Sequence, residues 1–427
     1  MDTLHISGSQ PLHGEVRISG SKNGTLPLLA ASLLVPGQTI INNVPQIRDV
    51  GTMIKMLRAL GAKCDWLGPG RLSIDASHIT SVAPPYDLVR AMRASFYVAG
   101  PLLARFGEAQ VPLPGGCIIG QRPVDQHIKG FEALGASVVD RHGVMYAQAG
   151  KLQGNTVYLD NRTRSVGATV NVMLLATLAE GTTIIENASR EPEVVCCEDF
   201  LRACGADIQG HGTSRVVING VPELHPAEGQ AIPDRMETGT FLVAGMVTKG
   251  DITVTNICAE HMDVVLPELA KAGAQIERHP DMIRLRNHTR PRAVEISTSP
   301  YPGFPTDLQP NMAVVATIAV GTSVIEETIF DMRFNYTDEL ARMGADIQVK
   351  DRVAIIKGVE KLYGAPVVAT DLRAGSALVL AGLAAEGRTE VAGAELLDRG
   401  YENFENKLCA LGAQVRRERH SVEESVC

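Results

Sequence analysis

An internal repeat is the feature that most constrains how this chain can fold. A phrase of the form Leu-x-x-x-Gly-Ala, or close to it, occurs six times along the 427 residues. Each phrase ends an amphipathic stretch, so we predict a helix, a left-handed glycine cap and then a strand in every copy. Even spacing over the whole chain indicates one structural unit used six times rather than six coincidental caps. The glycines are 74, 70, 68, 71 and 68 residues apart: Gly61, Gly135, Gly205, Gly273, Gly344 and Gly412.

A second glycine recurs upstream in each copy. It ends an apolar stretch of small residues, such as 168–178 or 376–385, and β-branched residues follow it. We therefore predict two helices and several short strands in each unit of about 70 residues. The weakly charged first helices favour burial on most sides. These upstream glycines are Gly37, Gly107, Gly181, Gly250, Gly321 and Gly387.

The length of the chain favours two domains, because one hydrophobic core rarely serves so many residues. Six units suggest two lobes of three, with the halfway point near residue 230. The segment 221–230 is polar and rich in Pro and Gly, which is typical of a linker. A cleft between two lobes is a common place for a ligand.

Composition excludes several classes of function. Aromatic residues make up 4% of the chain and the net charge is −8, which argues against nucleic-acid binding. No signal peptide is visible at the N-terminus, and the apolar runs are too short to span a membrane. We therefore expect a cytoplasmic protein. The eight cysteines show no Cys-x-x-Cys pair or zinc spacing, so we expect mostly buried or unreactive thiols.

The second copy carries an insertion that points to a functional loop. The gap between its two recurring glycines is 28 residues, against 23 to 25 in the other copies. The extra length falls in 113–123, which is rich in Pro and Gly and contains Cys117 and Arg122. Insertions into repeats are commonly loops on the binding face, and a nearby arginine lowers a thiol pKa. An ordinary loop cysteine is the alternative.

Charged residues recur where loops enter helices. Lys22 follows a Gly-Ser turn that is not a Walker loop, and Asp307 stands at a predicted helix start. Of Arg90 and Arg93, we expect one to be solvated and the other to face the cleft. Ordinary capping and solvation explain each position separately. Together they indicate an anion-binding cleft.

Read in order, these segments resemble the enolpyruvyl transferase family over essentially the whole chain. Within it they are similar to the branch that acts on UDP-N-acetylglucosamine. The sister branch, which acts on shikimate 3-phosphate, shares the Gly-Ser-Lys turn but lacks the loop cysteine. The matching segments are 20–23, 92–95, 113–125, 165–169, 233–240, 304–307, 371–374 and 398–402.

The resemblance implies an α/β (α+β) fold, a two-lobed inside-out α/β barrel. It has six βαβαββ repeats, three in each lobe. In this family the chain starts in one lobe, builds the other and returns. The implied lobes are 22–232, which carries the Cys117 loop, and 1–21 with 233–427. The implied active site lies in the cleft between them.

The resemblance also implies a reaction. The enolpyruvyl group of phosphoenolpyruvate moves to the 3-hydroxyl of UDP-N-acetylglucosamine by addition and elimination, and phosphate leaves. This is the first committed step of peptidoglycan synthesis, and so belongs to cell-wall biogenesis, cell shape, the cell cycle and division, and is the target of fosfomycin. The implied partners are these two small molecules, with no cofactor, metal, nucleic acid or membrane; the oligomeric state is left open.

Residue roles are implied by the same resemblance. Cys117 is the general acid, and Asp307 is either the base or a positioning group. Lys22, Arg122 and Arg399 hold phosphoenolpyruvate, supported by Arg93 and Arg373. Asn23 and Asp307 contact the amino sugar, and Ile329 reaches the nucleotide or sugar. The uridine diphosphate site comprises Arg122, Pro123, Val124, Asp125, Gln126, Ser165, Val166 and Gly167.

Two departures from the family pattern stand near this site: Gln121, and the positively charged segment 162–164. Two alternatives stay open. One is the sister transferase acting on shikimate 3-phosphate, against which Cys117 argues. The other is a catalytically silent paralogue that binds sugar nucleotides, against which the complete acid and base set argues.

Overall fold

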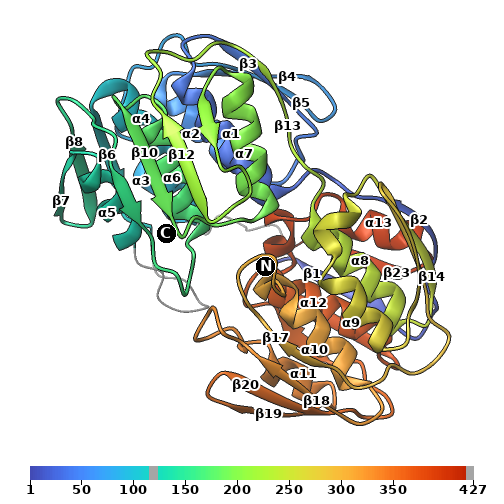
Figure 1. Ribbon diagram of the computed structural model, residues 1–427. Coiled ribbons are helices and arrows are strands. Elements are labelled where there is room, and N and C mark those ends of the chain that lie inside the picture. Colours follow the sequence, from blue (N-terminus) through green and yellow to red (C-terminus); the bar gives the residue numbers. More distant parts are fainter. Residues whose placement is uncertain (115–123, 420–427) are drawn as a thin grey trace.

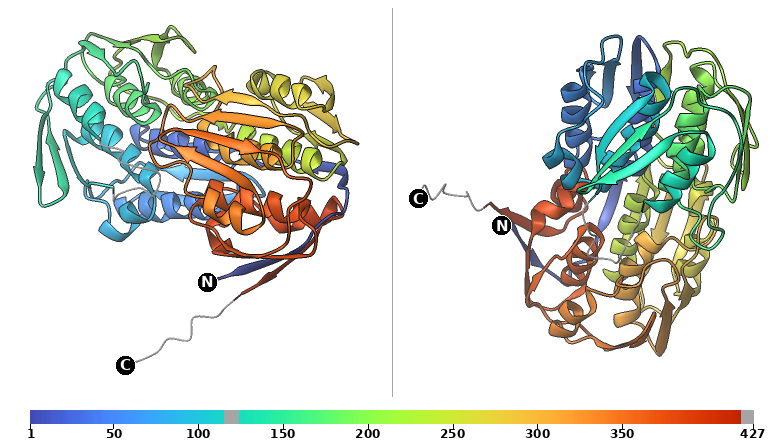
Figure 2. Two further views of the ribbon diagram at one scale, coloured as in Figure 1. Left: turned by 90° about the horizontal axis from the view of Figure 1, so that it is seen from below. Right: turned by 90° about the vertical axis from the view of Figure 1, so that its left-hand side faces the viewer.

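The structure, a computed structural model, describes residues 1–114 and 124–419. Cys117, Gln121, Arg122 and Pro123 therefore lie outside the described residues. The blue-to-green part of the chain forms one lobe, and the yellow-to-red part forms the other, together with β1 and β2 (Figure 1). Two further views show the two lobes side by side (Figure 2).

The described strands form small open sheets, five of four strands and one of three. In the first lobe the orders are β13(Glu228–Gln230)-β3(Gln38–Asn42)-β5(Arg71–Asp75)-β4(Lys63–Gly68), β6(Glu108–Pro112)-β8(Val144–Gln148)-β7(Ser137–Arg141) and β11(Asp207–Gln209)-β12(Arg215–Asn219)-β10(Thr182–Glu186)-β9(Thr156–Tyr158). In the second they are β15(Gln275–His279)-β16(Met282–Arg286)-β14(Asp251–Thr255)-β2(His13–Arg17), β17(Glu295–Ser297)-β18(Thr322–Glu326)-β20(Val353–Lys357)-β19(Asp346–Lys350) and β21(Pro366–Val368)-β22(Arg388–Ala392)-β1(Thr3–Ser7)-β23(Gln414–Glu418).

Helices alternate with these strands along the chain. Those of the first lobe are α1(Lys22–Ala31), α2(Arg48–Leu60), α3(Tyr86–Ala91), α4(Ala99–Phe106), α5(Asp125–Ala133), α6(Val166–Ala176) and α7(Pro192–Ala203), with 3-10 turns η1(Ser32–Leu34) and η2(Arg93–Val98). Those of the second are α8(Arg235–Val247), α9(Val265–Lys271), α10(Gln309–Thr317), α11(Thr337–Arg342), α12(Leu372–Ala384) and α13(Phe404–Ala410), with 3-10 turns η3(Ala259–Met262), η4(Thr306–Leu308) and η5(Ala394–Arg399).

The glycines of the repeated phrase adopt the backbone conformation predicted for them. All six have positive φ, between 92° and 113°, at the ends of α2, α5, α7, α9, α11 and α13. The upstream set is mixed, because Gly37 and Gly250 are not in the left-handed region. Gly250 is needed for a close approach instead, since a Cβ there would lie 2.3 Å from the Leu12 carbonyl oxygen.

Two separate hydrophobic cores underlie the two lobes. One contains buried residues between Leu26 and Ala231, and the other combines Leu4 to Ile18 with Met236 to Ala413. Every residue of α8 and of α10 is buried. These helices have few charged residues and pack on all sides, as the sequence predicted for the first helix of each unit.

Two local predictions were wrong. The segment 221–230 is not only a linker, because β13 pairs in parallel with β3. Residues 90–95 do not open one helix: the backbone is extended at Met92, which separates α3 from η2. As expected, Arg93 faces the cavity described below, while Arg90 is exposed and lies 5.6 Å from the Tyr86 ring. Of the six described cysteines, four are buried, Cys258 is partly buried and Cys409 is exposed.

The chain crosses between the cores at two adjacent segments, 19–22 and 231–234. Ser21 N–H donates to the Ile232 carbonyl at 2.7 Å, and Asp234 N–H donates to the Ser19 carbonyl at 2.9 Å. Gly20 and Pro233 form an isolated antiparallel bridge. This crossing point places the starts of α1 and α8 next to each other. In the part of the chain that the structure describes, no helix has the length and apolar character needed to span a bilayer.

Candidate active site

A cavity of about 740 Å³ is lined by residues of both lobes. Four buried helices begin there, and the first two residues of each line it. The partial positive charge of a helix N-terminus favours anions, so the fold itself makes this cavity suitable for phosphate or carboxylate groups. These pairs are Lys22 and Asn23 of α1, Val166 and Gly167 of α6, Arg235 and Met236 of α8, and Leu372 and Arg373 of α12.

Side-chain caps fix these helix starts. Ser21, Ser165, Asp234 and Asp371 each accept backbone N–H groups from the first turn of their helix, at 2.8 to 3.2 Å. Such caps satisfy N–H groups that no helical carbonyl can reach. Asp234 also accepts the Lys22 N–H at 3.1 Å, so one carboxylate ties α1 to α8.

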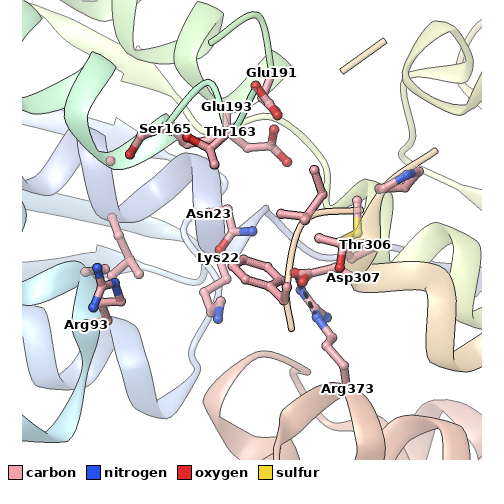
Figure 3. A pocket seen from close by; sticks show the side chains of 18 of the residues that line it. Lys22, Asn23, Arg93, Thr163, Ser165, Glu191, Glu193, Thr306, Asp307 and Arg373 are labelled. Carbon is pink, nitrogen blue, oxygen red and sulfur yellow. Dashed lines mark hydrogen bonds and ion pairs between the residues drawn. The ribbon is translucent and has the colours of Figure 1, made fainter. Parts of the chain in front are cut away.

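Asp307, on η4, lies between two arginines. Its Oδ1 accepts a hydrogen bond from Arg333 Nη2 at 2.9 Å, and its Oδ2 accepts one from Arg373 Nε at 3.1 Å. Burial alone raises the pKa of Asp307, but Arg373, Arg333 and Lys22 outweigh it and hold that pKa well below its usual range. Figure 3 shows Asp307 and Arg373 paired, with Lys22 nearby. The carboxylate is therefore ionised, and in this arrangement it is a weak base.

Asp49 lies between Lys22 and Arg399, two of the cations predicted to bind phosphoenolpyruvate. It stands in the first turn of α2 and is 3% exposed. Its Oδ1 accepts from Arg399 Nε at 3.0 Å, and its Oδ2 lies 3.6 Å from Lys22 Nζ. Burial lowers the pKa of Lys22, and Asp49 opposes that shift. Because Arg399 belongs to the second lobe, this carboxylate bridges the cavity. From the sequence, Asp49 resembles any first-turn acid, so it was missed.

The start of α5 and the loop 160–164 meet at the other end of the cavity. Gln126 Oε1 accepts the Asp160 N–H at 3.0 Å, and Asp160 Oδ1 accepts the Thr163 N–H at 2.8 Å. The hydrogen bond from the Thr163 N–H, supported by the Thr163 hydroxyl and the Arg162 N–H, lowers the pKa of the exposed Asp160. Thr163 and Arg164 line the cavity beside Ser165. The positively charged segment noted in the sequence thus reaches the predicted diphosphate subsite.

His127 is a buried cavity residue that the sequence did not identify. Asn171 accepts the Gly100 N–H through Oδ1 and donates through Nδ2 to the Phe96 carbonyl, each at 2.9 Å. The same Nδ2 lies 3.0 Å from His127 Nδ1, which must therefore accept, so the ring proton sits on Nε2. Burial, and then Arg93, lowers the pKa of His127 to about 3. The ring is neutral and presents Nε2–H beside Gly167, where a Cβ would lie 3.1 Å away.

On another wall of the cavity, Glu193 of the first lobe pairs with Arg235 of the second. Arg235 donates to both carboxylate oxygens of the buried Glu193, at 3.0 and 3.2 Å, and its guanidinium carbon lies 5.5 Å from the Tyr301 ring centroid. Tyr301 N–H also contacts Glu191 at 3.4 Å. Burial raises the pKa of Glu191, partly offset by its hydrogen bond to Ser189. Neither glutamate was identified from the sequence, because Arg235 and Tyr301, which connect them to the second lobe, lie more than 40 residues away.

The structure brings every described residue of the predicted site to this one cavity. Those outside the described residues are Cys117, Arg122 and Pro123. No group of three or more metal-ligating side chains occurs within residues 1–114 and 124–419. The lining residues that were predicted are Lys22, Asn23, Arg93, Val124, Asp125, Gln126, Ser165, Val166, Gly167, Asp307, Ile329, Arg373 and Arg399.

Comparison with known proteins gives concordant results. The family described as EPSP synthase (3-phosphoshikimate 1-carboxyvinyltransferase) matches residues 6–408. UDP-N-acetylglucosamine 1-carboxyvinyltransferase 3 of Symbiobacterium thermophilum is 49% identical over 424 residues, 99% of each chain. UDP-N-acetylglucosamine 1-carboxyvinyltransferase of Geobacter metallireducens is 48% identical over 418 residues, 98% of this chain and 99% of its own.

Solved structures agree on the fold. The enolpyruvyl transferase NikO from Streptomyces tendae has a TM-score of 0.89 at 27% identity, covering 97% of this chain and 98% of its own. EPSP synthase from Acinetobacter baumannii has a TM-score of 0.78 at 18% identity, covering 98% of this chain and 100% of its own, and is informative for the fold alone. The chain therefore belongs to the EPSP synthase family of enolpyruvyl transferases, and over almost its whole length it resembles those named UDP-N-acetylglucosamine 1-carboxyvinyltransferase.

Proposed function

We propose that this protein transfers the enolpyruvyl group of phosphoenolpyruvate to the 3-hydroxyl of UDP-N-acetylglucosamine and releases phosphate. The observation that carries the proposal is the convergence of four helix N-termini with Lys22, Arg373 and Arg399 on one cavity. The chain is also about half identical to transferases named for this acceptor. A cavity that gathers these helix N-termini and cationic side chains suits a substrate that carries a phosphate and a carboxylate.

Lys22 and Arg399 are the proposed contacts to phosphoenolpyruvate, with Arg93 and Arg373 supporting, and Arg122 from outside the described residues. In the structure, Lys22 and Arg399 both pair with Asp49. The substrate phosphate offers more charge and more acceptor oxygens than one carboxylate. Phosphoenolpyruvate would therefore replace Asp49 as the acceptor for Lys22 and Arg399, which Asp49 holds in position.

The proposed chemistry has two steps. The sugar hydroxyl oxygen bonds to C2 of phosphoenolpyruvate and its proton passes to a base, for which Asp307 is the candidate, while C3 gains a proton from Cys117. The tetrahedral intermediate then loses phosphate from C2, and the Cys117 thiolate takes back a proton from C3, which restores the double bond. Preorganised cations stabilise the charge that develops on the phosphate and the carboxylate.

Asp307 has two possible uses in this scheme. The low pKa of Asp307 supports a role in positioning the hydroxyl. It would become a stronger base only after Arg373 or Arg333 turned from it toward the substrate. Asn23 would contact the amino sugar beside it, and Ile329 would touch the nucleotide or sugar.

The uridine diphosphate would lie along the starts of α5 and α6. Val124, Asp125 and Gln126, following Arg122 and Pro123, would contact it on one side, and 165–167 on the other. The helix N-terminus at Val166 favours the diphosphate. His127 adds an uncharged donor there, whose protonation does not change near neutral pH.

We further propose that the lobes are 22–232 and 1–21 with 233–427, each an inside-out α/β barrel of three βαβαββ units. The two separate cores, the fully buried helices and the three small sheets in each lobe support this. In the cell, the reaction would be the first committed step of peptidoglycan synthesis in the cytoplasm, serving cell-wall biogenesis, cell shape and division.

The experiment that tests the function identifies the product. Protein, phosphoenolpyruvate and UDP-N-acetylglucosamine are incubated, and the nucleotide is analysed by mass spectrometry. We expect UDP-N-acetylglucosamine carrying one enolpyruvyl group. An unchanged nucleotide would contradict the proposal, and product formed only from shikimate 3-phosphate would assign the chain to the sister reaction.

Cys117 is tested separately. Cys117→Ser should reduce turnover about 100-fold or more near neutral pH, because a hydroxyl is a much weaker acid than a thiol. Cys409→Ser, at an exposed cysteine far along the chain, is the matched control and should keep full activity. Fosfomycin should alkylate Cys117, seen as one adduct on a peptide containing it. Normal turnover of Cys117→Ser would remove this residue from the mechanism.

A further inference from the structure

We propose that Arg417 is a positioning residue that holds Arg399 in place for phosphoenolpyruvate. The inference rests on the proposed function, in which Arg399 contacts this substrate. Arg417 belongs to β23, pairs opposite Leu4 of β1, and lies outside the cavity lining. Figure 2 shows β1 and β23 side by side.

Arg417 is buried among three carboxylates. Its side chain is 7% exposed, and Nη1 and Nη2 each donate to one oxygen of Asp398 at 2.7 Å. Nη2 also donates to Glu405 at 3.2 Å, and Nη1 lies 3.5 Å from an Asp2 oxygen. The planar guanidinium fork matches a carboxylate with two parallel bonds, which fixes the direction of the partner as well as its distance.

Asp398 and Arg399 are the last two residues of η5, and their side chains are held on opposite sides. Asp398 pairs with Arg417 inside the second lobe, whereas Arg399 reaches across the cavity to Asp49. The start of η5 is also fixed, because the Asp2 carbonyl accepts the N–H groups of Gly393 and Ala394 at 2.9 and 3.0 Å. Arg417 therefore fixes the end of the turn from which Arg399 extends.

Among the described residues, Arg417 is the one cation that binds all three of these carboxylates, so its loss would leave their charges unbalanced. Without Arg417, the carboxylates of Asp2, Asp398 and Glu405 would lose the cation that all three share, and like charges that share one site repel. Since Asp2, Asp398 and Glu405 belong to the N-terminus, η5 and α13, the repulsion would separate these segments. Arg399, at the end of η5, would then lose the fixed position from which it reaches the proposed phosphoenolpyruvate subsite.

The first test is a pair of steady-state measurements on Arg417→Met. We expect the KM for phosphoenolpyruvate to rise by about tenfold or more, with the KM for UDP-N-acetylglucosamine nearly unchanged. Arg416→Met is the matched control: it is the neighbouring residue, 74% exposed, and should leave both constants unchanged. Arg417→Lys should recover only part of the loss. Equal changes in both KM values, or none, would overturn the proposal.

A double-mutant cycle separates positioning from stability. Once Arg399→Ala has removed the cation, adding Arg417→Met should not raise the KM for phosphoenolpyruvate further. Additive effects would overturn the proposal.

If Arg417→Met does not fold, Asp398→Asn replaces it in both tests, because Arg417 then keeps its contacts with Glu405 and Asp2. Wild-type protein that forms no product would refute the proposed function; wild-type turnover with unchanged Arg417→Met kinetics would refute only this inference.

Discussion

At the scale of single residues, the site is defined by carboxylates that pair with its cations. Asp307 lies between Arg333 and Arg373, and Asp49 lies between Lys22 and Arg399. Each pair satisfies charges that would be costly to bury alone. If these cations bind phosphoenolpyruvate as proposed, its anionic groups would replace the carboxylates on them, and the pairs would hold the cations in position beforehand.

The pairing of Asp307 gives a prediction about pH. Its folded pKa is depressed, so its contribution to stability is present above the unfolded pKa and is lost as pH falls below about 4. Between pH 5 and pH 9 Asp307 should stay ionised and should cause no change in kcat/KM. Asp307→Asn should lower kcat about 100-fold or more. Asp346→Asn, at an exposed strand position, is the control; equal effects of both variants would contradict the role of Asp307.

Buried His127 predicts a loss of stability in acid. Its pKa is lowered to about 3, so below about pH 6.5 the unfolded chain binds a proton that the folded protein does not. Stability should therefore fall by about 2 kcal/mol from this group between pH 7 and pH 5. His127→Gln should remove this part of the pH dependence in urea unfolding, whereas His142→Gln, at an exposed position, should not. The same slope in both variants would show that His127 is not the cause.

At the scale of elements, the starts of buried helices form the site. Asp234 caps α8 and also binds the Lys22 N–H, so it couples an ordinary cap to the position of a proposed substrate contact. The same residue types occur at many helix starts that bind nothing. The function comes from bringing four such starts together.

Asp234→Ala tests this coupling. The loss of the cap should lower the free energy of unfolding by about 1–2 kcal/mol in urea, and the KM for phosphoenolpyruvate should rise as Lys22 loses its anchor. Asp234→Asn keeps an oxygen acceptor for the cap and should be milder on both measures. An Asp234→Ala variant as stable as the wild type would contradict the role of this cap.

Structural features that depend on neighbouring residues could be predicted from the sequence, and features that depend on contacts between distant residues could not. The six glycine caps were visible because left-handed backbone strongly favours glycine. The parallel strand β13 was not, because these three residues of a Pro/Gly-rich segment pair with β3, which is far away in sequence. The break at Met92 leaves no composition signal either.

The residues of the candidate site also divide into those that were predicted from local sequence and those that were missed. Lys22, Asp307 and Arg399 stood out at repeated loop-to-helix joints, and the family resemblance supplied their roles. Asp49 did not stand out, because its partner Arg399 is 350 residues away. His127 reads as an ordinary core histidine until Asn171 and Gly167 are placed around it. Pairing across a cleft has no local sequence signature.

At the scale of the whole molecule, two lobes share one cavity and are joined by two crossing segments. Paired side chains also span the lobes, such as Arg399 with Asp49 and Arg235 with Glu193. A shared cavity must exclude water during the reaction, and a two-lobed protein does so by closing. We therefore expect UDP-N-acetylglucosamine to draw the lobes together.

Small-angle X-ray scattering measures this closure. The radius of gyration should decrease when UDP-N-acetylglucosamine is added, and shikimate 3-phosphate, as the matched control ligand, should leave it unchanged. Superimposable profiles with and without the sugar nucleotide would show that the lobes do not close on it.

The most direct test of the central claim is phosphate release from phosphoenolpyruvate, measured with UDP-N-acetylglucosamine and separately with shikimate 3-phosphate. We predict release only with the sugar nucleotide, and its loss in Cys117→Ser. Release only with shikimate 3-phosphate would keep the fold and the type of reaction but contradict the acceptor. No release with either acceptor, in protein that still binds UDP-N-acetylglucosamine, would contradict catalysis and favour a silent binding protein.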